Sequence, residues 1–349
     1  MSETNIYLAN KVVESGKDHT VIRKIFVRNL KIVPFGDAKV WGTIDDQFSL
    51  DEYGQFLRVA TTNNQGGDQW SNVYTLDYYC KSYGVLTRIA PGEKIYSARY
   101  VGKRLYLITF RQVDPFFVIS FSSFRAPTVL GVLKMTGYSS YLHPIDENTI
   151  LGFGRDATVG GAPRGLKIAV FDVSNANNPK LSASATINET YANSSALLEH
   201  KAFLFSKERN LLVVPGTLNN GKNVRFNGAF VFSVTKTSIS VTGMIDHLIN
   251  ANDNFAVRNV ERSLYIESIL YTKSKCLLRI NRIDSKFTGV SNINIPCGQN
   301  VTTGVLTPVK PLPAVLPVKN WNDLFTHLLM LQHVLNNNNV NNWLLIQYL

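Results

Sequence analysis

The amino-acid sequence predicts an all-β protein, a β-propeller of four-stranded antiparallel blades, about six in number with the first incomplete. Residues 95–133 contain four short β-prone runs separated by a tight turn and two proline-containing breaks. A third strand led by valine recurs at Val73, Val118, Val170 and Val231, at intervals of 45, 52 and 61 residues. Propeller repeats run about 40–50 residues, and loop insertions account for the longer intervals. The 15 tyrosines and 19 phenylalanines also favour strands.

The first 44 residues predict three strands, near Ile6–Leu8, Thr20–Val27 and Lys31–Trp41, so the first blade lacks its opening strand. Five complete blades are expected after it. Blade by blade, their predicted strands are Phe48–Tyr53, Phe56–Thr61, Asn72–Asp77 and Val85–Ile89; Ile95–Val101, Leu105–Phe110, Phe116–Ser122 and Thr128–Leu133; Ser140–Ile145, Thr149–Phe153, Leu166–Val173 and Leu181–Ile187; Ala196–Leu204, Asn210–Val214, Gly228–Val234 and Ser238–Met244; and Phe255–Val260, Leu264–Leu270, Cys276–Ile283 and Gly289–Ile295.

The loops between second and third strands differ from the other connections. First and second strands are joined by short polar turns such as residues 102–104, which is hairpin chemistry. The second-to-third-strand loops at 62–68, 155–161 and 216–227 are longer and rich in glycine. In a propeller they share one face with the loops that enter each blade, and that face rims the central channel.

The sequence predicts three regions. Residues 1–296 form the propeller domain, 297–320 a proline-rich linker, and 321–349 an asparagine-rich tail with a helix at Trp321–Leu335. A closed ring would need Val301–Leu306 to supply the strand missing from the first blade. Because prolines follow that segment, we expect an open arc, truncated at its N-terminus, whose exposed apolar surface the helix covers.

Several stretches of the sequence resemble a known family. They are Ile44–Thr62, Ala90–Ser120, Tyr138–Asp156, Gly165–Lys180 and Glu199–Pro215. Together they resemble secreted bacterial and archaeal proteins with a C-terminal β-propeller domain, which is distantly related to WD40 propellers. The resemblance implies a propeller located outside the cytoplasm, and it carries over no catalytic residue. Members of that family continue upstream with further blades and a secretion signal, whereas the first residues here lack a signal-peptide pattern.

Composition and motifs exclude several classes of protein. The net charge is +11, but no run of basic residues and no RNA-binding motif is present, so nucleic acid is not favoured as a partner. No apolar run is long enough to span a membrane. Cys80, Cys276 and Cys297 form neither a disulfide framework nor a zinc motif, and at most one bridge is possible. The sequence lacks Gly-x-Ser-x-Gly, HExxH and Walker motifs, so we predict no cofactor, no metal and no catalytic residue.

Two pairs of opposite charges occupy equivalent loops of adjacent blades. Arg111 and Asp114 lie in one loop, and Arg155 and Asp156 in the next. Arginine forks bind carboxylates and phosphates bidentately, so these loops could hold an anionic ligand. The alternative is that each arginine pairs with its neighbouring aspartate, or with the next blade, and fixes the loop. Arg99 and Asp46 complete the set of predicted ligand-binding residues.

Other polar residues admit both structural and functional interpretations. The acidic cluster Asp45, Asp46, Asp51 and Glu52 lacks calcium-loop spacing, so salt bridges between blades compete with a divalent metal site. His143 and His200 lie in opening-strand regions of adjacent blades, where acid–base chemistry competes with a structural role. Candidate glycosylation sites are Asn188, Asn193 and Asn300.

Three functions are compatible with the sequence. The first is a non-catalytic binding or interaction module whose partner is an unknown protein or an anionic ligand, with the oligomeric state left open. The second is a hydrolase-type enzyme that brings together, at the channel mouth, at least two of His143, His200, Glu93, Arg99 and Asp46. The third is a truncated, functionless copy of a longer secreted propeller protein.

Overall fold

The computed structural model describes residues 5–28, 31–110, 114–158, 160–189, 191–221, 223–248 and 258–297. They belong to one compact unit, Met1–Cys297, and the chain has a second unit, Gly298–Leu349. The predicted linker, the predicted helix and the proposed closing strand Val301–Leu306 all lie outside the described residues. Those predictions therefore stay predictions.

The described chain consists mainly of strands joined by short turns. The elements are β1 (Asn5–Glu14), β2 (Lys17–Arg28), β3 (Lys31–Trp41), the 3-10 turn η1 (Gln47–Ser49), β4 (Leu50–Tyr53), β5 (Phe56–Gln65), β6 (Asp68–Leu76), β7 (Ser82–Ile89), β8 (Lys94–Val101), β9 (Arg104–Phe110), β10 (Asp114–Ser120), β11 (Thr128–Met135), β12 (Tyr138–Asp146), β13 (Thr149–Ala157), β14 (Pro163–Asp172), β15 (Lys180–Ile187), the 3-10 turns η2 (Ser195–Leu197) and η3 (His200–Ala202), β16 (Leu204–Ser206), β17 (Leu211–Asn219), β18 (Val224–Val234), β19 (Ile239–Asp246), β20 (Val260–Ile266), β21 (Ile269–Ser274), β22 (Leu277–Arg282) and β23 (Gly289–Asn294).

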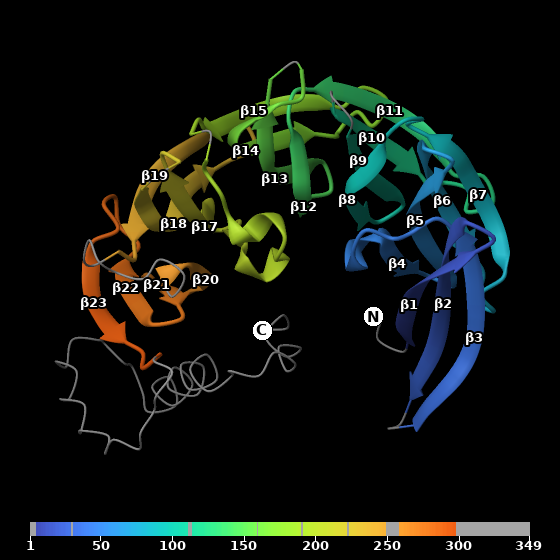
Figure 1. Ribbon diagram of the computed structural model, residues 1–349, viewed down its shortest axis with the longest axis horizontal. Helices are drawn as coiled ribbons and strands as arrows, with labels where there is room; N and C mark the ends of the chain where they lie inside the picture. The colour runs from blue at the N-terminus through green and yellow to red at the C-terminus, as the bar shows by residue number, and fades with distance from the viewer. Residues whose placement is uncertain are drawn as a thin grey trace. The chain divides into compact units, whose positions relative to one another are not determined.

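These strands form a series of antiparallel meanders. The first sheet has three strands, β1-β2-β3, and five four-stranded sheets follow in chain order, from β4–β7 to β20–β23. Figure 1 shows the sheets following one another along an arc, with β8 and β12 toward the inside and β7 and β11 on the outside. The predicted propeller of antiparallel four-stranded blades, with an incomplete first blade, is confirmed.

Buried apolar side chains lie in five clusters, one between each pair of adjacent sheets. The alternation of side chains along each strand sends every second residue toward a neighbouring sheet. Between the third and fourth sheets, Phe116 of β10 stacks on Phe171 of β14 with ring centroids 4.3 Å apart, and neither side chain is exposed. Each sheet thus depends on its neighbours for burial, as in other repeat architectures.

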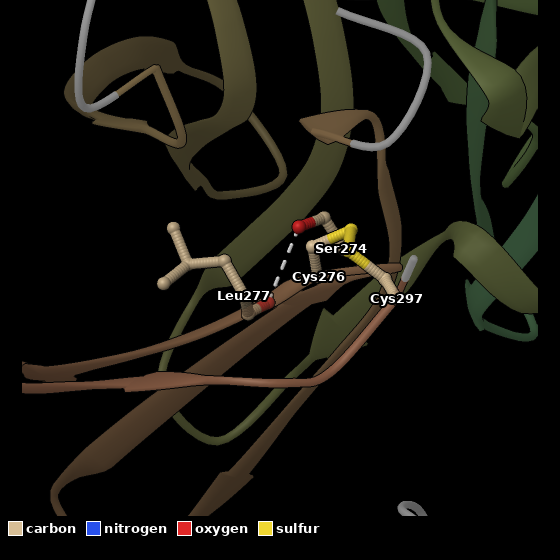
Figure 2. Close-up of a disulfide and its surroundings, with 4 residues drawn as sticks. All are labelled: Ser274, Cys276, Leu277 and Cys297. Carbon is tan, nitrogen blue, oxygen red and sulfur yellow. Dashed lines mark hydrogen bonds between the residues drawn. A yellow bond between two sulfur atoms is a disulfide. The ribbon is translucent and has the colours of Figure 1, made fainter. Parts of the chain in front are cut away.

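A disulfide joins the two ends of the last hairpin. Cys276 precedes β22 and Cys297 follows β23; their Cα atoms are 5.3 Å apart (Figure 2). The Ile295 amide donates to the Cys276 carbonyl at 2.9 Å, and the Ser274 hydroxyl donates to the Leu277 carbonyl at 3.3 Å (Figure 2). The single bridge that the cysteine count allowed is therefore Cys276–Cys297, and Cys80 is a buried free thiol.

Three strand predictions in the later sheets are wrong. The opening strand of the last sheet is β20, so the predicted strand Phe255–Val260 shares only Val260 with it; residues 255–257 lie outside the described residues. The predicted strand Ala196–Leu204 is instead η2 and η3, because the Ser194 and Glu199 side chains each accept a hydrogen bond from the amide two residues on. The predicted strand Leu264–Leu270 straddles a two-residue turn after Ile266, whose first residue, Glu267, has a left-handed φ of 49°. Neither glycine nor asparagine marks that turn, so the usual hairpin signal is missing.

Candidate functional site

A cavity of about 970 Å³ opens where the inner strands of the sheets begin. Its wall comes from strands of four of the six sheets, from residues 193–201, and from the loop and 3-10 turn that lead into the second sheet. The lining residues are Asp45, Asp46, Gln47, Phe48, Lys94, Ile95, Tyr96, Tyr138, Ser140, Tyr141, Arg155, residues 193–201, Pro215, Gly216, Thr217, Asn227, Asn259 and Val260. Arg155 of β13 and Asn227 of β18 also reach the cavity. The sequence predicted Arg155, Gly216 and Asn227 to lie in glycine-rich loops, whereas the structure places them in strands at the cavity.

Residues 191–203 form a short insert on one side of the cavity, ahead of β16. The backbone of Asn193 pairs with that of Thr217 in β17. Arg155 of β13 donates to the Ala192 carbonyl at 3.1 Å and to Asn193 Oδ1 at 2.8 Å. These bonds anchor the insert to both neighbouring sheets. At its tip, the side chain of Leu198 is 97% exposed at the cavity wall.

One part of the opposite wall is aromatic. Phe48, which follows the loop into the second sheet, lies 5.6 Å from Tyr141 of β12 and 5.0 Å from His200, measured between ring centroids. The Arg99 guanidinium stacks 3.8 Å from the Phe48 centroid, and its Nε donates to the Leu142 carbonyl at 2.7 Å. The arginine therefore joins three sheets and fixes the orientation of the Phe48 ring.

A second group of rings extends this wall. Tyr96 of β8 lies 4.7 Å from Tyr138 of β12 and 5.4 Å from Phe110 of β9, measured between centroids. The Lys94 ammonium lies 4.7 Å from the Tyr96 ring centroid. The lining rings of both groups are partly exposed, so the cavity presents aromatic surface on side chains that pack against one another.

Two adjacent carboxylates, Asp45 and Asp46, lie beside the rings. Asp46 caps η1 by accepting a hydrogen bond from the Phe48 amide at 2.8 Å. Burial and the Asp46 charge raise the pKa of Asp45 to about 6, and Lys94 acts in the opposite direction. The Asp45 carboxylate accepts no hydrogen bond from any residue in the described ranges, so it is available to a ligand.

The charges of the cavity wall cancel. Asp45, Asp46 and Glu199 supply three carboxylates, and Lys94, Arg155 and Lys201 supply three cations. Burial lowers the pKa of His200, which favours its neutral form. The basic balance of the whole chain is therefore not concentrated at this cavity.

The structure places the predicted charged pairs as follows. Arg155 bonds to the insert of the next blade and not to its neighbour Asp156, which corresponds to the second of the two structural alternatives. Asp156 is buried and forms ion pairs with Arg164 at 2.6 Å and with Lys167 at 3.5 Å. Arg111 and the side chain of Asp114 lie outside the described residues.

The predicted acidic cluster divides into separate contacts. Asp51 pairs with the buried Arg58 of its own sheet. Glu52 accepts from Asn5 of the first sheet at 2.9 Å, which is a link between blades. Only Asp45 and Asp46 face the cavity. No group of three potential metal-ligating side chains occurs among the residues that the structure describes.

Of the residues predicted for acid–base chemistry, Asp46 and His200 line the same cavity, whereas His143 and Glu93 do not. His143 packs against Phe203 and Phe205, and burial lowers its pKa to about 4. Glu93 accepts a hydrogen bond from Thr109. His200 lies at the cavity, and its Nε2 is 3.0 Å from the side-chain nitrogen Nε2 of Gln47.

Of the glycosylation candidates, Asn188 and Asn193 are exposed, and Asn300 lies outside the described residues. None of the helices in the described part of the chain has the length and apolarity needed to cross a lipid bilayer.

Sequence reasoning missed the lining role of Lys94, Tyr96, Tyr138 and Leu198. Lys94, Tyr96 and Tyr138 lie at the starts of β8 and β12. Their position could have been predicted, because the opening strand of a propeller blade begins at the channel rim. The position of Leu198 could not, since it depends on an insert that breaks the repeat.

The comparisons with known proteins agree with this architecture. A family model described as a β-propeller domain matches residues 1–286. An uncharacterised protein of Methanocaldococcus jannaschii is 34% identical over 260 residues, which cover 74% of this chain and 37% of that protein. An uncharacterised protein of Archaeoglobus fulgidus is 36% identical over 193 residues, which cover 55% of this chain and 29% of that protein. The chain thus spans well under half the length of these two curated relatives. By the extent of the family match, this chain belongs to the β-propeller domain family.

Proposed function

We propose that this chain is a non-catalytic binding module whose ligand occupies the cavity on the channel-rimming face. The observation that carries the proposal is the cavity itself, which is lined by strands of four sheets and by the loop that leads into a fifth. Ligand sites of this size are concave, partly aromatic and lined by a few polar groups. The interlocked rings and the anchored insert support a site that exists before the ligand arrives.

The polar groups at the cavity favour binding over catalysis. Asp46 bonds to the Phe48 amide, and His200 is paired with the Gln47 amide. An acid–base mechanism needs a positioned proton donor or acceptor within reach of the substrate. The contacts of these two groups instead stabilise the loop that carries Phe48.

A cavity-filling variant tests this proposal. Ser195 is exposed on η2 and lines the cavity, so Ser195→Trp places an indole inside it. Ser184→Trp is the matched control, because Ser184 is exposed on the outer strand β15. Thermal-shift screening of small molecules, oligosaccharides and peptides on the wild-type chain should give ligands that Ser184→Trp retains and Ser195→Trp loses.

The outcomes separate the three functions. Ligands that bind Ser195→Trp as well as the wild-type chain would contradict the cavity as the site. If mass spectrometry shows that the protein has chemically changed a bound ligand, the result would favour the enzyme. Failure of every probe to bind a folded wild-type chain would favour the functionless copy.

We also propose that the protein works outside the cytoplasm. The Cys276–Cys297 bridge supports this location, because disulfides persist mainly in oxidising compartments. Cells that naturally express the chain can be quenched with an alkylating agent and the cysteines examined by mass spectrometry. Unmodified, bridged Cys276 is expected, and alkylated Cys276 would contradict the proposal.

A further inference from the structure

We propose that the ligand of the cavity is a neutral carbohydrate. This inference rests on the proposed function and adds the chemical class of the ligand. It follows from the balance of charge, the partly exposed aromatic rings and the hydrogen-bonding groups that line the cavity.

The charge of the wall does not select a charged ligand. Three carboxylates and three cations line the cavity. The guanidinium of Arg155, which the sequence suggested as an anion fork, donates to Ala192 and Asn193 instead. A charged ligand would lose its hydration without meeting a complementary field, whereas an uncharged one avoids that cost.

The rings supply a surface that fits the faces of a sugar. Tyr96 and Phe48 lie at two separate places on the same wall, each fixed by contacts with further rings. Partly exposed aromatic rings bury apolar C–H surface while keeping polar edges wet. A pyranose presents such C–H faces, and the partly exposed rings at two places on the wall offer apolar contact to successive sugar units of a chain.

Hydrogen-bonding groups lie beside the rings. The Asp45 carboxylate has no hydrogen-bond donor among the described residues, and Ser195 exposes its side chain to the same space. Gln47 lies there too, with its side-chain nitrogen paired with His200. Carboxylates, amides and hydroxyls pair well with adjacent hydroxyl groups of a ring. The wall therefore combines stacking surface with acceptors and donors at its margin.

At β17 the backbone of the wall is poorly suited to an extended peptide. Peptides often bind by adding a strand to an open sheet edge. Where β17 lines the cavity, Pro215 has no N–H, Gly216 pairs with Gly228 of β18, and the Thr217 amide and carbonyl are bonded to Asn193. This part of the edge offers no free backbone donor to an incoming peptide.

Titration calorimetry with oligosaccharides tests the inference. The probes are neutral hexasaccharides of glucose, mannose, galactose, xylose and N-acetylglucosamine, with uronic-acid and sulfated oligosaccharides as the charged arm and a random peptide pool as the third arm. At least one neutral probe should bind, with an affinity that changes little between about 0.05 and 0.5 M salt. A carboxylate hydrogen bond and a stacking ring are each expected to contribute about tenfold to that affinity.

Two variants with matched controls locate the binding. Asp45→Asn and Tyr96→Leu should each weaken the neutral probe about tenfold. Asp68→Asn and Tyr83→Leu should not, because Asp68 and Tyr83 are exposed outside the cavity. If Tyr96→Leu fails to fold, Ser195→Trp takes its place and should abolish binding.

Each result decides the matter. Binding only of charged or peptide probes, lost in Ser195→Trp, would overturn the carbohydrate inference and leave the binding module standing. Neutral-sugar binding that survives Asp45→Asn and Tyr96→Leu would overturn the cavity as its site. Absence of binding by every probe would overturn both.

Discussion

Removing the Cys276–Cys297 disulfide should lower the free energy of unfolding of the last sheet by about 3 kcal/mol. The bridge joins residues separated by 21 positions and encloses the β22–β23 hairpin (Figure 2). A cross-link around a loop of about 22 residues lowers the entropy of the unfolded chain by about 11 cal/mol/K, which is about 3 kcal/mol at 25 °C. The strand pairing and the Ile295–Cys276 hydrogen bond remain without the bridge, so the loss arises in the unfolded state.

Because the buried apolar clusters lie between adjacent sheets, sheets can unfold separately and a single global midpoint would hide the effect. Hydrogen exchange in increasing urea, read by mass spectrometry on β22 and β23, measures the last sheet directly. The double variant Cys276→Ser/Cys297→Ser should lose protection there and keep it in β5 and β6. A reductant should reproduce the loss in the wild-type chain and change nothing in the variant. Equal protection of reduced and oxidised wild-type chains would refute the reasoning.

Three further changes follow from packing and charge. Phe171→Ala should lower the free energy of unfolding by about 3–5 kcal/mol, measured by urea denaturation, because the ring is fully buried in a stack between two sheets; a loss below about 1 kcal/mol would contradict tight packing there. Gly154→Ala should reduce the yield of folded protein, since an added methyl group would overlap the Tyr138 carbonyl oxygen, and normal thermal stability would show that the register of β12 and β13 differs. Burial lowers the pKa of His143 to about 4 and of His247 to about 3, from 6.5. As the pH drops from 6.5 toward 4, the unfolded chain therefore binds protons at these histidines before the folded chain does, and the urea midpoint should fall. His143→Gln should flatten this dependence, and an unchanged midpoint of the wild-type chain across that window would contradict it.

The architecture was predictable because it depends on a repeated pattern. Alternating apolar residues and regular turns identify each meander, and the repeated valine-led strands place the third strand of successive blades near the right residues. The incomplete first sheet followed from the same count, because only three β-prone runs precede the loop that enters β4.

The errors occur where local hydrogen bonding overrides the repeat. Residues 194–203 are apolar enough to suggest a strand, but Ser194 and Glu199 cap two short turns and take the chain out of the sheet. The turn at Glu267 uses a residue that rarely adopts a left-handed conformation, so its position could not be read from glycine or asparagine.

The candidate site was harder to predict than the fold. Arg99 in a predicted strand and Arg155 in a predicted loop stood out as charged residues, yet the structure shows them bonded to neighbouring blades. The cavity instead depends on residues that are unremarkable in sequence, such as Tyr96 at the opening of a strand and Leu198 on the insert. Which side chains meet at a channel is set by the ring geometry of several repeats and not by any one motif.

Hydrogen exchange on the wild-type chain, with and without its tightest neutral oligosaccharide, tests the central claim most directly. If the cavity is the binding site, protection should rise in residues 45–48 and 193–201 and stay unchanged in the outer strands β7, β11 and β15. Protection confined to outer strands, or equal across all sheets, would contradict the claim.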